Sequence, residues 1–375
     1  MRVRARYQID MNRTRTAMGV VAIAFSIATS WAVAQPASLT AVPKLIEDAR
    51  KQAGAPGLSV AVVVNDRIAW EGAAGQADVE NAVSARADSV YRIASISKPI
   101  AATAIMQLVE RGRVALDEPV RPYLPHFPDK GGLTLTIRHL LTHTSGIRHY
   151  KEGEMESMAR YDSNEAAAKI FEADPLLFTP GTKYSYSTYA YNLLAGVIER
   201  ASGLTYEAYV KEHVWGPAGM AATVLERAEE IVPHRVRQYV KSGGSVQNAH
   251  YADLSVKWAG GGVLSTAGDL ARFHIALDEG KLLKPETLRQ MYTPAQLTDG
   301  TKTNYGLGWM VSTDQKGRTW IAHSGGATGG STYLLRNPEA KVAVVVLCNV
   351  QNAGNLRQLA MDIAEIALAS RAPTE

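Results

Sequence analysis

The chain has 375 residues, of which 46% are hydrophobic and 20% are charged, the composition of an ordinary globular protein. Its formal net charge of +4 comes from residues 1–34, where five arginines face one aspartate, so the rest of the chain has 35 basic and 35 acidic residues. This balance excludes the basic footprint of a nucleic-acid-binding protein and a general attraction to anionic surfaces. Cys348 is the only cysteine, which excludes an internal disulfide and a cysteine-based metal site.

The N-terminus has the three-part pattern of a secretory signal peptide. Arginine-rich residues 1–15 precede an apolar run, Ala17–Ile27, and the small residues Ala32-Val33-Ala34 follow. The apolar run is shorter than a membrane span. We therefore expect residues 1–34 to be a signal peptide cleaved near Ala34-Gln35, translated from Met1 or Met11. The mature chain, residues 35–375, would be periplasmic or secreted, without stable membrane insertion.

Hydrophobic periodicity predicts an α+β fold. A helix over 39–52 and a β-hairpin over 57–65 and 67–75, turning at Asn65-Asp66, come first. Helical patterns follow over 133–146, 164–172, 186–202, 205–213 and 267–277. Strand patterns return over 305–311, 318–323, 331–336 and 341–349, before a helix over 355–370. This order predicts an antiparallel sheet built from both chain ends (about 35–94 and 300–375) and flanked by the terminal helices, with a mostly helical insertion (about 95–299) and a cleft between them.

The stretch Ser95-Ile96-Ser97-Lys98 places a hydroxyl and an amine three residues apart at the start of a predicted helix. Residues at this spacing share a helix face, and Pro99 is tolerated only near the first turn. The N-terminal edge of a helix stabilises an oxyanion and favours a neutral lysine, which can act as the base that a serine nucleophile needs. Ser-x-x-Lys alone is a weak signal, because it should occur by chance about once in a chain of this length.

Two further motifs give that signal weight. Tyr186-Ser187-Thr188 opens a predicted helix, and His323-Ser324-Gly325-Gly326 ends a predicted strand before a glycine-rich turn. A serine with a lysine, a tyrosine at a helix start, and a basic residue followed by Ser-Gly form the three-part pattern of penicillin-recognising serine hydrolases.

Over nearly the whole predicted mature chain, the sequence resembles the class C β-lactamase and D-alanyl-D-alanine carboxypeptidase superfamily. The sequence patterns of residues 140–146, 193–199 and 260–270 are similar to those of that family. Residues 145–150, 186–188 and 257–262 are similar to its mitochondrial serine β-lactamase-like protease branch.

The resemblance implies a β-lactamase/transpeptidase-like fold and a set of catalytic roles. Ser95 would be the nucleophile, Lys98 its partner in proton transfer, and Tyr186 the second base and acid that serves the leaving group. The backbone N–H groups of Ser95 and Gly326 would form the oxyanion hole. The remaining implied residues would bind substrate: His323, Ser324, Gly325 and Thr188.

Two residues depart from the lactamase pattern. Many relatives have asparagine where Thr188 stands, and lactamases usually have lysine where His323 stands. Imidazole is mostly neutral at pH 7, so its pull on a substrate carboxylate is weaker. We therefore expect a peptidase-like or carboxylesterase-like enzyme acting on a small molecule or peptide. The alternatives are a weak class C-type β-lactamase and a catalytically silent penicillin- or peptidoglycan-binding module.

His139 and His143 lie one helical turn apart in the predicted helix, with His149 nearby, which is a conceivable metal site. No glutamate follows His139 as a zinc-protease motif requires, so a structural role is favoured. We expect no metal and no cofactor, and the sequence leaves the oligomeric state open.

Overall fold

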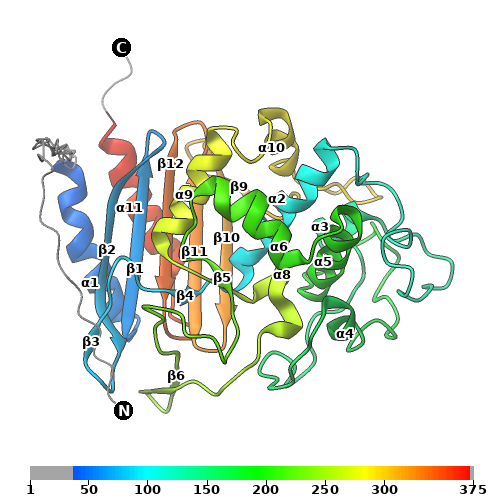
Figure 1. The fold of residues 1–375 in the computed structure, drawn as a ribbon. Helices are drawn as coiled ribbons and strands as arrows, with labels where there is room; N and C mark the ends of the chain where they lie inside the picture. The colour runs from blue at the N-terminus through cyan, green and yellow to red at the C-terminus, as the bar shows by residue number, and fades with distance from the viewer. Residues whose placement is uncertain (1–36, 372–375) are drawn as a thin grey trace, which may run out of the picture. The chain divides into compact units, whose positions relative to one another are not determined.

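The computed structural model describes residues 37–371, so the predicted signal peptide lies outside the described residues. Its main sheet is antiparallel and has seven strands, in the order β3-β2-β1-β12-β11-β10-β9 (Figure 1). The strands are β1 (Gly57–Val64), β2 (Arg67–Asp78), β3 (Val83–Ser84), β9 (Met310–Thr313), β10 (Thr319–Ala327), β11 (Gly330–Asn337) and β12 (Val342–Cys348). Strand β1 pairs directly with β12, which confirms the prediction of a sheet built from both chain ends.

The central strands are apolar on both faces. Every residue of β1 and β12 is buried, and alternate side chains enter different cores. Ala61 and Val63 face the helical region, whereas Val60 and Val62 face the terminal helices. Burying a valine completely contributes roughly 1.5–3 kcal/mol, so both layers hold the sheet in place.

Helices cover both faces of the sheet (Figure 1). Helices α1 (Val42–Gln52) and α11 (Leu356–Ala369) pack on one face, and α9 (Ala267–Asp278) packs on the other. The predicted N-terminal helix is observed as α1, preceded by the 3-10 turn η1 (Ala37–Ala41). The predicted hairpin turn is confirmed, because Asn65 and Asp66 both have positive φ, as a two-residue turn of type I′ requires.

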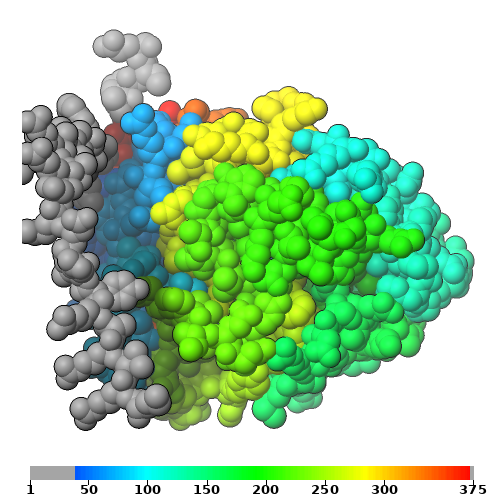
Figure 2. Space-filling view, in the orientation of Figure 1, coloured from blue at the N-terminus to red at the C-terminus, as the bar shows by residue number. Residues whose placement is uncertain are grey.

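The chain between β3 and β9 forms the predicted, mostly helical region, which makes up most of the face seen in Figure 2 (cyan, green and yellow). Its central helix, α2, is buried over nearly its whole length and packs against α5 and α8. Its elements are β4 (Tyr91–Arg92), η2 (Ala94–Ile96), α2 (Ser97–Glu110), α3 (Ile137–Leu141), α4 (Asn164–Ala168), α5 (Tyr189–Ser202), α6 (Tyr206–Val210), the π-helical turn η3 (Lys211–Trp215), α7 (Gly216–Ala218), β5 (Val224–Leu225), β6 (Tyr239–Ser242), β7 (Ser245–Asn248), η4 (Ser255–Lys257), α8 (Trp258–Gly261), β8 (Val263–Ser265) and α10 (Pro285–Met291).

Three predicted elements are wrong in extent, and one of them is the helix expected over 164–172, which ends at Ala168 as α4. The helix expected over 133–146 is only α3, because Thr136 caps its start and His143, with a φ of +58°, ends helical geometry soon after Leu141. The strand expected over 305–311 is instead a turn leading into β9, because Gly308 has a φ of +87°. No helix within residues 37–371 is both long enough and apolar enough to cross a membrane.

Candidate active site

Ser95 is the accessible residue in a buried stretch. Each of the other residues from Tyr91 to Ile100 is buried, whereas Ser95 is partly exposed and lines a cavity of about 430 Å³. The residue before it, Ala94, has a φ of +49°, a left-handed conformation that strains a side-chain-bearing residue. Strain of this kind is concentrated at functional sites. The buried Ser97 instead donates its hydroxyl to the Ala94 carbonyl at 2.7 Å.

Lys98 lies in the first turn of α2, as its spacing from Ser95 predicts. Its Nζ lies 3.1 Å from Ser95 Oγ, 3.1 Å from Thr188 Oγ1 and 2.6 Å from the Gly260 carbonyl oxygen. The side chain is fully buried, and burial, reinforced by the nearby Lys257 charge, holds the pKa of Lys98 well below its ordinary value. A neutral amine donates two hydrogen bonds and accepts one. In the neutral form, the lone pair can therefore accept a hydrogen bond from the Ser95 hydroxyl, while the two N–H groups donate to the Gly260 carbonyl and to Thr188 Oγ1.

Tyr186 precedes α5 and lines the same cavity. The Lys98 Nζ lies 4.7 Å from the centre of its ring, and the His143 ring packs on it at 4.2 Å between centroids. Burial raises the pKa of the Tyr186 phenol, although an interaction with the Ser95 side chain opposes this shift. The phenol therefore stays protonated at neutral pH, which suits it to donate or relay a proton rather than to act as a phenolate base.

Two histidines hold the backbone beside Tyr186. The Nδ1 of His143 accepts from the Ser187 N–H, and the Nδ1 of His149 accepts from the Thr188 N–H, both at 3.2 Å. His139 has a different role, since its Nδ1 accepts from the Thr136 N–H in the capping box of α3. These contacts correspond to the structural role that the sequence favours for this group.

Strand β10 brings Gly326 to the cavity opposite Ser95. A Cβ at Gly325 would lie 2.2 Å from Thr332 Oγ1 and 2.6 Å from the Ile93 carbonyl oxygen, so glycine is needed for the close approach of β10 to the segment before Ser95. A Cβ at Gly326 would meet no atom within 4 Å, so its outer side is open space. Gly326 and Ser324 line the cavity, whereas Gly325 packs behind it.

Besides Gly325, which packs behind the cavity, the structure changes the picture for two predicted substrate contacts, Thr188 and His323. Thr188 is only 2% exposed and does not line the cavity, and its Oγ1 accepts from Lys98, so its hydroxyl contacts the lysine rather than the cavity. His323 lines the cavity, but its Nδ1 donates to the Ser324 carbonyl oxygen at 2.7 Å. Its Nε2 accepts from the Tyr305 hydroxyl at 2.8 Å, and burial lowers its pKa to about 3. His323 therefore lines the cavity as a neutral ring, in line with the weak pull on a carboxylate expected of an imidazole.

Several lining residues were not anticipated from the sequence. Tyr305 was considered only as the first residue of a predicted strand, and His149 was considered only as a metal ligand. Among residues 37–371, no aspartate, glutamate, lysine or arginine lines this cavity. The cavity residues missed by the sequence analysis are His149, Tyr184, Asn304, Tyr305 and Met310.

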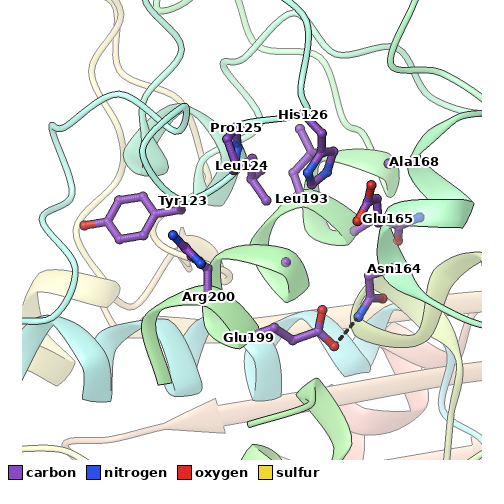
Figure 3. Close-up of a pocket in the computed structure, with 12 residues that line it drawn as sticks. Tyr123, Leu124, Pro125, His126, Asn164, Glu165, Ala168, Leu193, Glu199 and Arg200 are labelled. Carbon is purple, nitrogen blue, oxygen red and sulfur yellow. Dashed lines mark hydrogen bonds between the residues drawn. The ribbon is translucent and has the colours of Figure 1, made fainter. Parts of the chain in front are cut away.

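A separate cavity of about 340 Å³ lies between α4, α5 and the loop Tyr123–His126 (Figure 3). Glu199 and Asn164 are hydrogen-bonded there. Because none of Ser95, Lys98 and Tyr186 lines it, this cavity is distinct from the candidate active site.

A sheet covered by helices, with a serine at a helix start beside a buried lysine and a tyrosine, defines a serine hydrolase of the penicillin-recognising class. Comparison with known proteins supports this class, since the family model described as Beta-lactamase matches residues 42–368. The chain belongs to the Beta-lactamase family, as its motifs predict, and it is a serine hydrolase.

Individual relatives support the same family assignment. The mitochondrial serine beta-lactamase-like protein LACTB of Homo sapiens is 31% identical, over 85% of this chain and 78% of its own. The D-alanyl-D-alanine-carboxypeptidase/endopeptidase AmpH of Escherichia coli K12 is 28% identical, over 78% of this chain and 79% of its own. The solved structure of a D-stereospecific amidohydrolase from Streptomyces sp. superposes with a TM-score of 0.74, at 28% identity, over 87% of this chain and 98% of that one. The individual catalytic roles stay predictions.

Proposed function

We propose that the chain is an exported enzyme that cleaves amide or ester bonds through an acyl-enzyme on Ser95, acting as a peptidase-like or carboxylesterase-like member of its family. The observation that carries this proposal is the buried Lys98 amine, 3.1 Å from Ser95 Oγ. A hydroxyl is a weak nucleophile until a base sits against it, and a desolvated lysine supplies that base.

The reaction has two half-reactions. As Ser95 Oγ bonds to the scissile carbonyl carbon, its proton passes to the neutral Nζ of Lys98, and the oxyanion accepts from the N–H groups of Ser95 and Gly326. The Tyr186 hydroxyl gives its proton to the departing nitrogen or oxygen as that bond breaks, and Lys98 restores the proton to Tyr186. Water then attacks the acyl-enzyme and gives up its proton along the same route. Release of the carboxylic acid regenerates the Ser95 hydroxyl.

The cavity favours uncharged groups next to the scissile bond. In the described part of the chain, its lining has no carboxylate, ammonium or guanidinium, and His323 is neutral. A penicillin or a C-terminal D-alanyl peptide presents a carboxylate near this bond, and burying an unpaired charge is costly. Neutral esters, amides and internal peptide bonds are therefore the better substrates, and β-lactam turnover is the weaker activity.

Purified protein tested with a p-nitrophenyl ester, a D-alanyl peptide, an L-peptide and a chromogenic cephalosporin separates these activities. Two results support the proposal. Ser95→Ala should lower ester hydrolysis by orders of magnitude, and a fluorophosphonate should form an adduct on Ser95 of the wild type. An adduct on Ser97 or Ser324 contradicts it. Labelling without turnover of any substrate identifies a silent binding module, and preferred turnover of the cephalosporin identifies a β-lactamase.

Export is proposed from the arginine-rich and apolar pattern of residues 1–34. Expression of the full chain in a Gram-negative host should release a form that begins near Gln35 into the periplasm, which mass spectrometry of the fractionated cells can identify. A full-length chain that stays in the cytoplasm contradicts export, and the hydrolase proposal is unaffected by that result.

A further inference from the structure

The cavity drawn in Figure 3, which we call the α4–α5 cavity, presents unpaired charges of both signs. Helix α5 contributes Glu199 and Arg200 to its wall, and α4 contributes Glu165. Within residues 37–371, none of these three side chains forms an ion pair. The volume of about 340 Å³ is typical of a small-molecule site. Unpaired charges on the wall of such a cavity are available to a charged ligand.

The Glu199 carboxylate uses only one of its oxygens to hold the fold. Its Oε1 accepts from the Asn164 side-chain amide and from the Tyr206 N–H, both at 3.0 Å. Its Oε2 has no hydrogen-bond partner in the described part of the chain and is not sealed from solvent, and in Figure 3 it points toward the middle of the residues drawn. Burial raises the pKa of this carboxyl, although the two hydrogen bonds oppose the shift. A cationic group against Oε2 would offset the cost of burying the charge.

A buried acceptor on the same face of α5 also lacks a partner. Asn192 lines the cavity and is only 2% exposed. Its Nδ2 donates to the Val256 carbonyl, but its Oδ1 has no hydrogen-bond partner among residues 37–371. Asn192, Gly196 and Glu199 follow the spacing i, i+4, i+7, so they share one helix face. Buried polar atoms are nearly always hydrogen-bonded, so an unpartnered acceptor in the wall of a cavity indicates a ligand that donates.

The rest of the wall suits an anion and an apolar group. In Figure 3 the guanidinium of Arg200 points to the side of Tyr123, whereas the Glu199 carboxylate points to the side of Asn164. A guanidinium is always charged, and its N–H groups match the geometry of a carboxylate. The apolar part of the wall consists of Leu124, Pro125, Ala168 and Leu193. The cavity therefore complements a molecule that carries an ammonium group, a carboxylate and an apolar side chain.

We propose that the α4–α5 cavity binds a free amino acid with an apolar side chain, with its ammonium group against Glu199 and its carboxylate against Arg200. An ammonium group has three N–H donors, enough for the free oxygen of Glu199 and for further acceptors in the wall. Glu165 adds a second negative charge that favours the ammonium group. The inference does not rest on the proposed function, because none of Ser95, Lys98 and Tyr186 lines this cavity.

Calorimetric titrations with three ligands of the same carbon skeleton test this site: leucine, leucinamide and 4-methylpentanoate. Leucinamide lacks the carboxylate, and 4-methylpentanoate lacks the ammonium group. The purified protein carries Ser95→Ala, so that leucinamide is not hydrolysed, and both enantiomers of leucine are titrated. At least one enantiomer should bind about 10-fold or more tightly than 4-methylpentanoate and about 2- to 5-fold more tightly than leucinamide. Equal affinities for the three ligands, or no binding of leucine up to about 10 mM, overturn the inference.

Two substitutions assign each charge of leucine to its partner. Glu199→Gln keeps an acceptor for the fold but removes the charge, so leucine affinity should fall by about 10- to 100-fold and the advantage over 4-methylpentanoate should disappear. Arg200→Gln should lower leucine affinity by about 2- to 5-fold and remove the advantage over leucinamide, because this arginine is exposed. The matched controls Glu286→Gln and Arg289→Gln change the same charges on exposed residues of α10 that do not line the cavity, and they should leave the affinity unchanged.

Leucine affinity that is unchanged in both Glu199→Gln and Arg200→Gln shows that leucine binds elsewhere and overturns the inference. Losses of the same size in the two α10 controls show a general effect of charge and overturn it as well. Thermal melts identify any variant that does not fold, and if Glu199→Gln fails, Arg200→Gln and the comparison of the three ligands decide. An absence of hydrolase activity contradicts the proposed function alone, because leucine binding is measured without turnover.

Discussion

The hydroxyl of Tyr305 lies 2.8 Å from the Nε2 of His323, deep in the active-site wall. Because the other ring nitrogen donates to the Ser324 carbonyl, His323 keeps one proton, which faces the backbone, and stays neutral. A histidine at the position where lactamases usually have lysine is therefore not a weaker cation. It is a neutral residue that holds the end of β10.

The lowered pKa of Lys98 and the neutral state of His323 together predict a simple pH profile of kcat/KM. Protonated Lys98 cannot accept the Ser95 proton, so kcat/KM should rise with pH through the lowered pKa of Lys98 and then level off. A neutral ester and a matched carboxylate-bearing ester should give the same profile between about pH 5 and pH 8, because His323 does not titrate there. A selective loss of the carboxylate-bearing substrate around pH 6 to 7 would show that an imidazolium binds it.

Replacing the base without removing the positive charge tests the role of Lys98. Lys98→Arg puts a permanently charged guanidinium beside Ser95, so kcat should fall by about 10²- to 10⁴-fold, as expected when a general base is lost. Steady-state kinetics and thermal melts of the variant measure the effect. A variant within about tenfold of the wild type would indicate that another group takes the Ser95 proton.

The hydroxyl of Thr188 should matter for rate rather than for substrate binding. Thr188→Val keeps the shape but removes the acceptor 3.1 Å from Lys98 Nζ, so kcat should fall by about 3- to 10-fold with little change in KM. Thr188→Ser retains the hydroxyl and is the matched control. Equal kcat values for the two variants would show that the lysine does not depend on this contact.

Adjacent glycines in β10 should respond differently to alanine. Gly325→Ala forces a methyl group against Thr332 and the Ile93 backbone, so it should lower the free energy of unfolding by roughly 1–3 kcal/mol as well as the activity. Gly326→Ala meets open space, so the melting temperature should be kept while the methyl group obstructs the cavity and lowers kcat/KM. Equal losses of stability would contradict this distinction.

Buried neutral histidines should make the fold sensitive to acid. The ring of His274 is fully buried, neither of its nitrogens has a partner within residues 37–371, and burial beside Arg336 holds its pKa well below the ordinary 6.5. The unfolded chain binds this proton below about pH 6.5 and the folded chain does not, so stability is full above that pH and falls as the pH drops. Melting temperatures from about pH 7.5 to pH 5 measure the slope.

His274→Leu should make the fall below about pH 6.5 shallower, because it removes one of the groups that the folded state keeps neutral. His143 and His323 also have lowered pKa values and remain in this variant, so part of the slope should persist. An unchanged slope would show that His274 contributes nothing to acid sensitivity.

Local patterns determined much of this protein. The turn at Asn65-Asp66 and the apolar strands of the sheet follow from turn chemistry and from periodicity. The proximity of Ser95 and Lys98 follows from helix geometry at a spacing of three residues. These features depend on neighbours in the chain, so the sequence was enough to predict them.

The extent of α3 and the path before β9 depended on backbone turns at His143 and Gly308 that periodicity does not report. A residue with positive φ ends an element whatever the hydrophobic pattern around it, and histidine adopts such a conformation only in a suitable tertiary setting. Apolar spacing alone therefore predicted a longer helix and an earlier strand.

Only the tertiary structure decided the chemical state of the site. Burial lowers the pKa of Lys98 well below its ordinary value, and the Gly260 carbonyl, 162 residues along the chain, is an acceptor for its Nζ. Burial keeps His323 neutral while its Nε2 accepts from Tyr305, and the Lys98 contact assigns Thr188 to the lysine. A sequence states which groups can ionise or donate, but desolvation and distant partners set their protonation and direction, and both arise only when the sheet and the helical region close around the cavity.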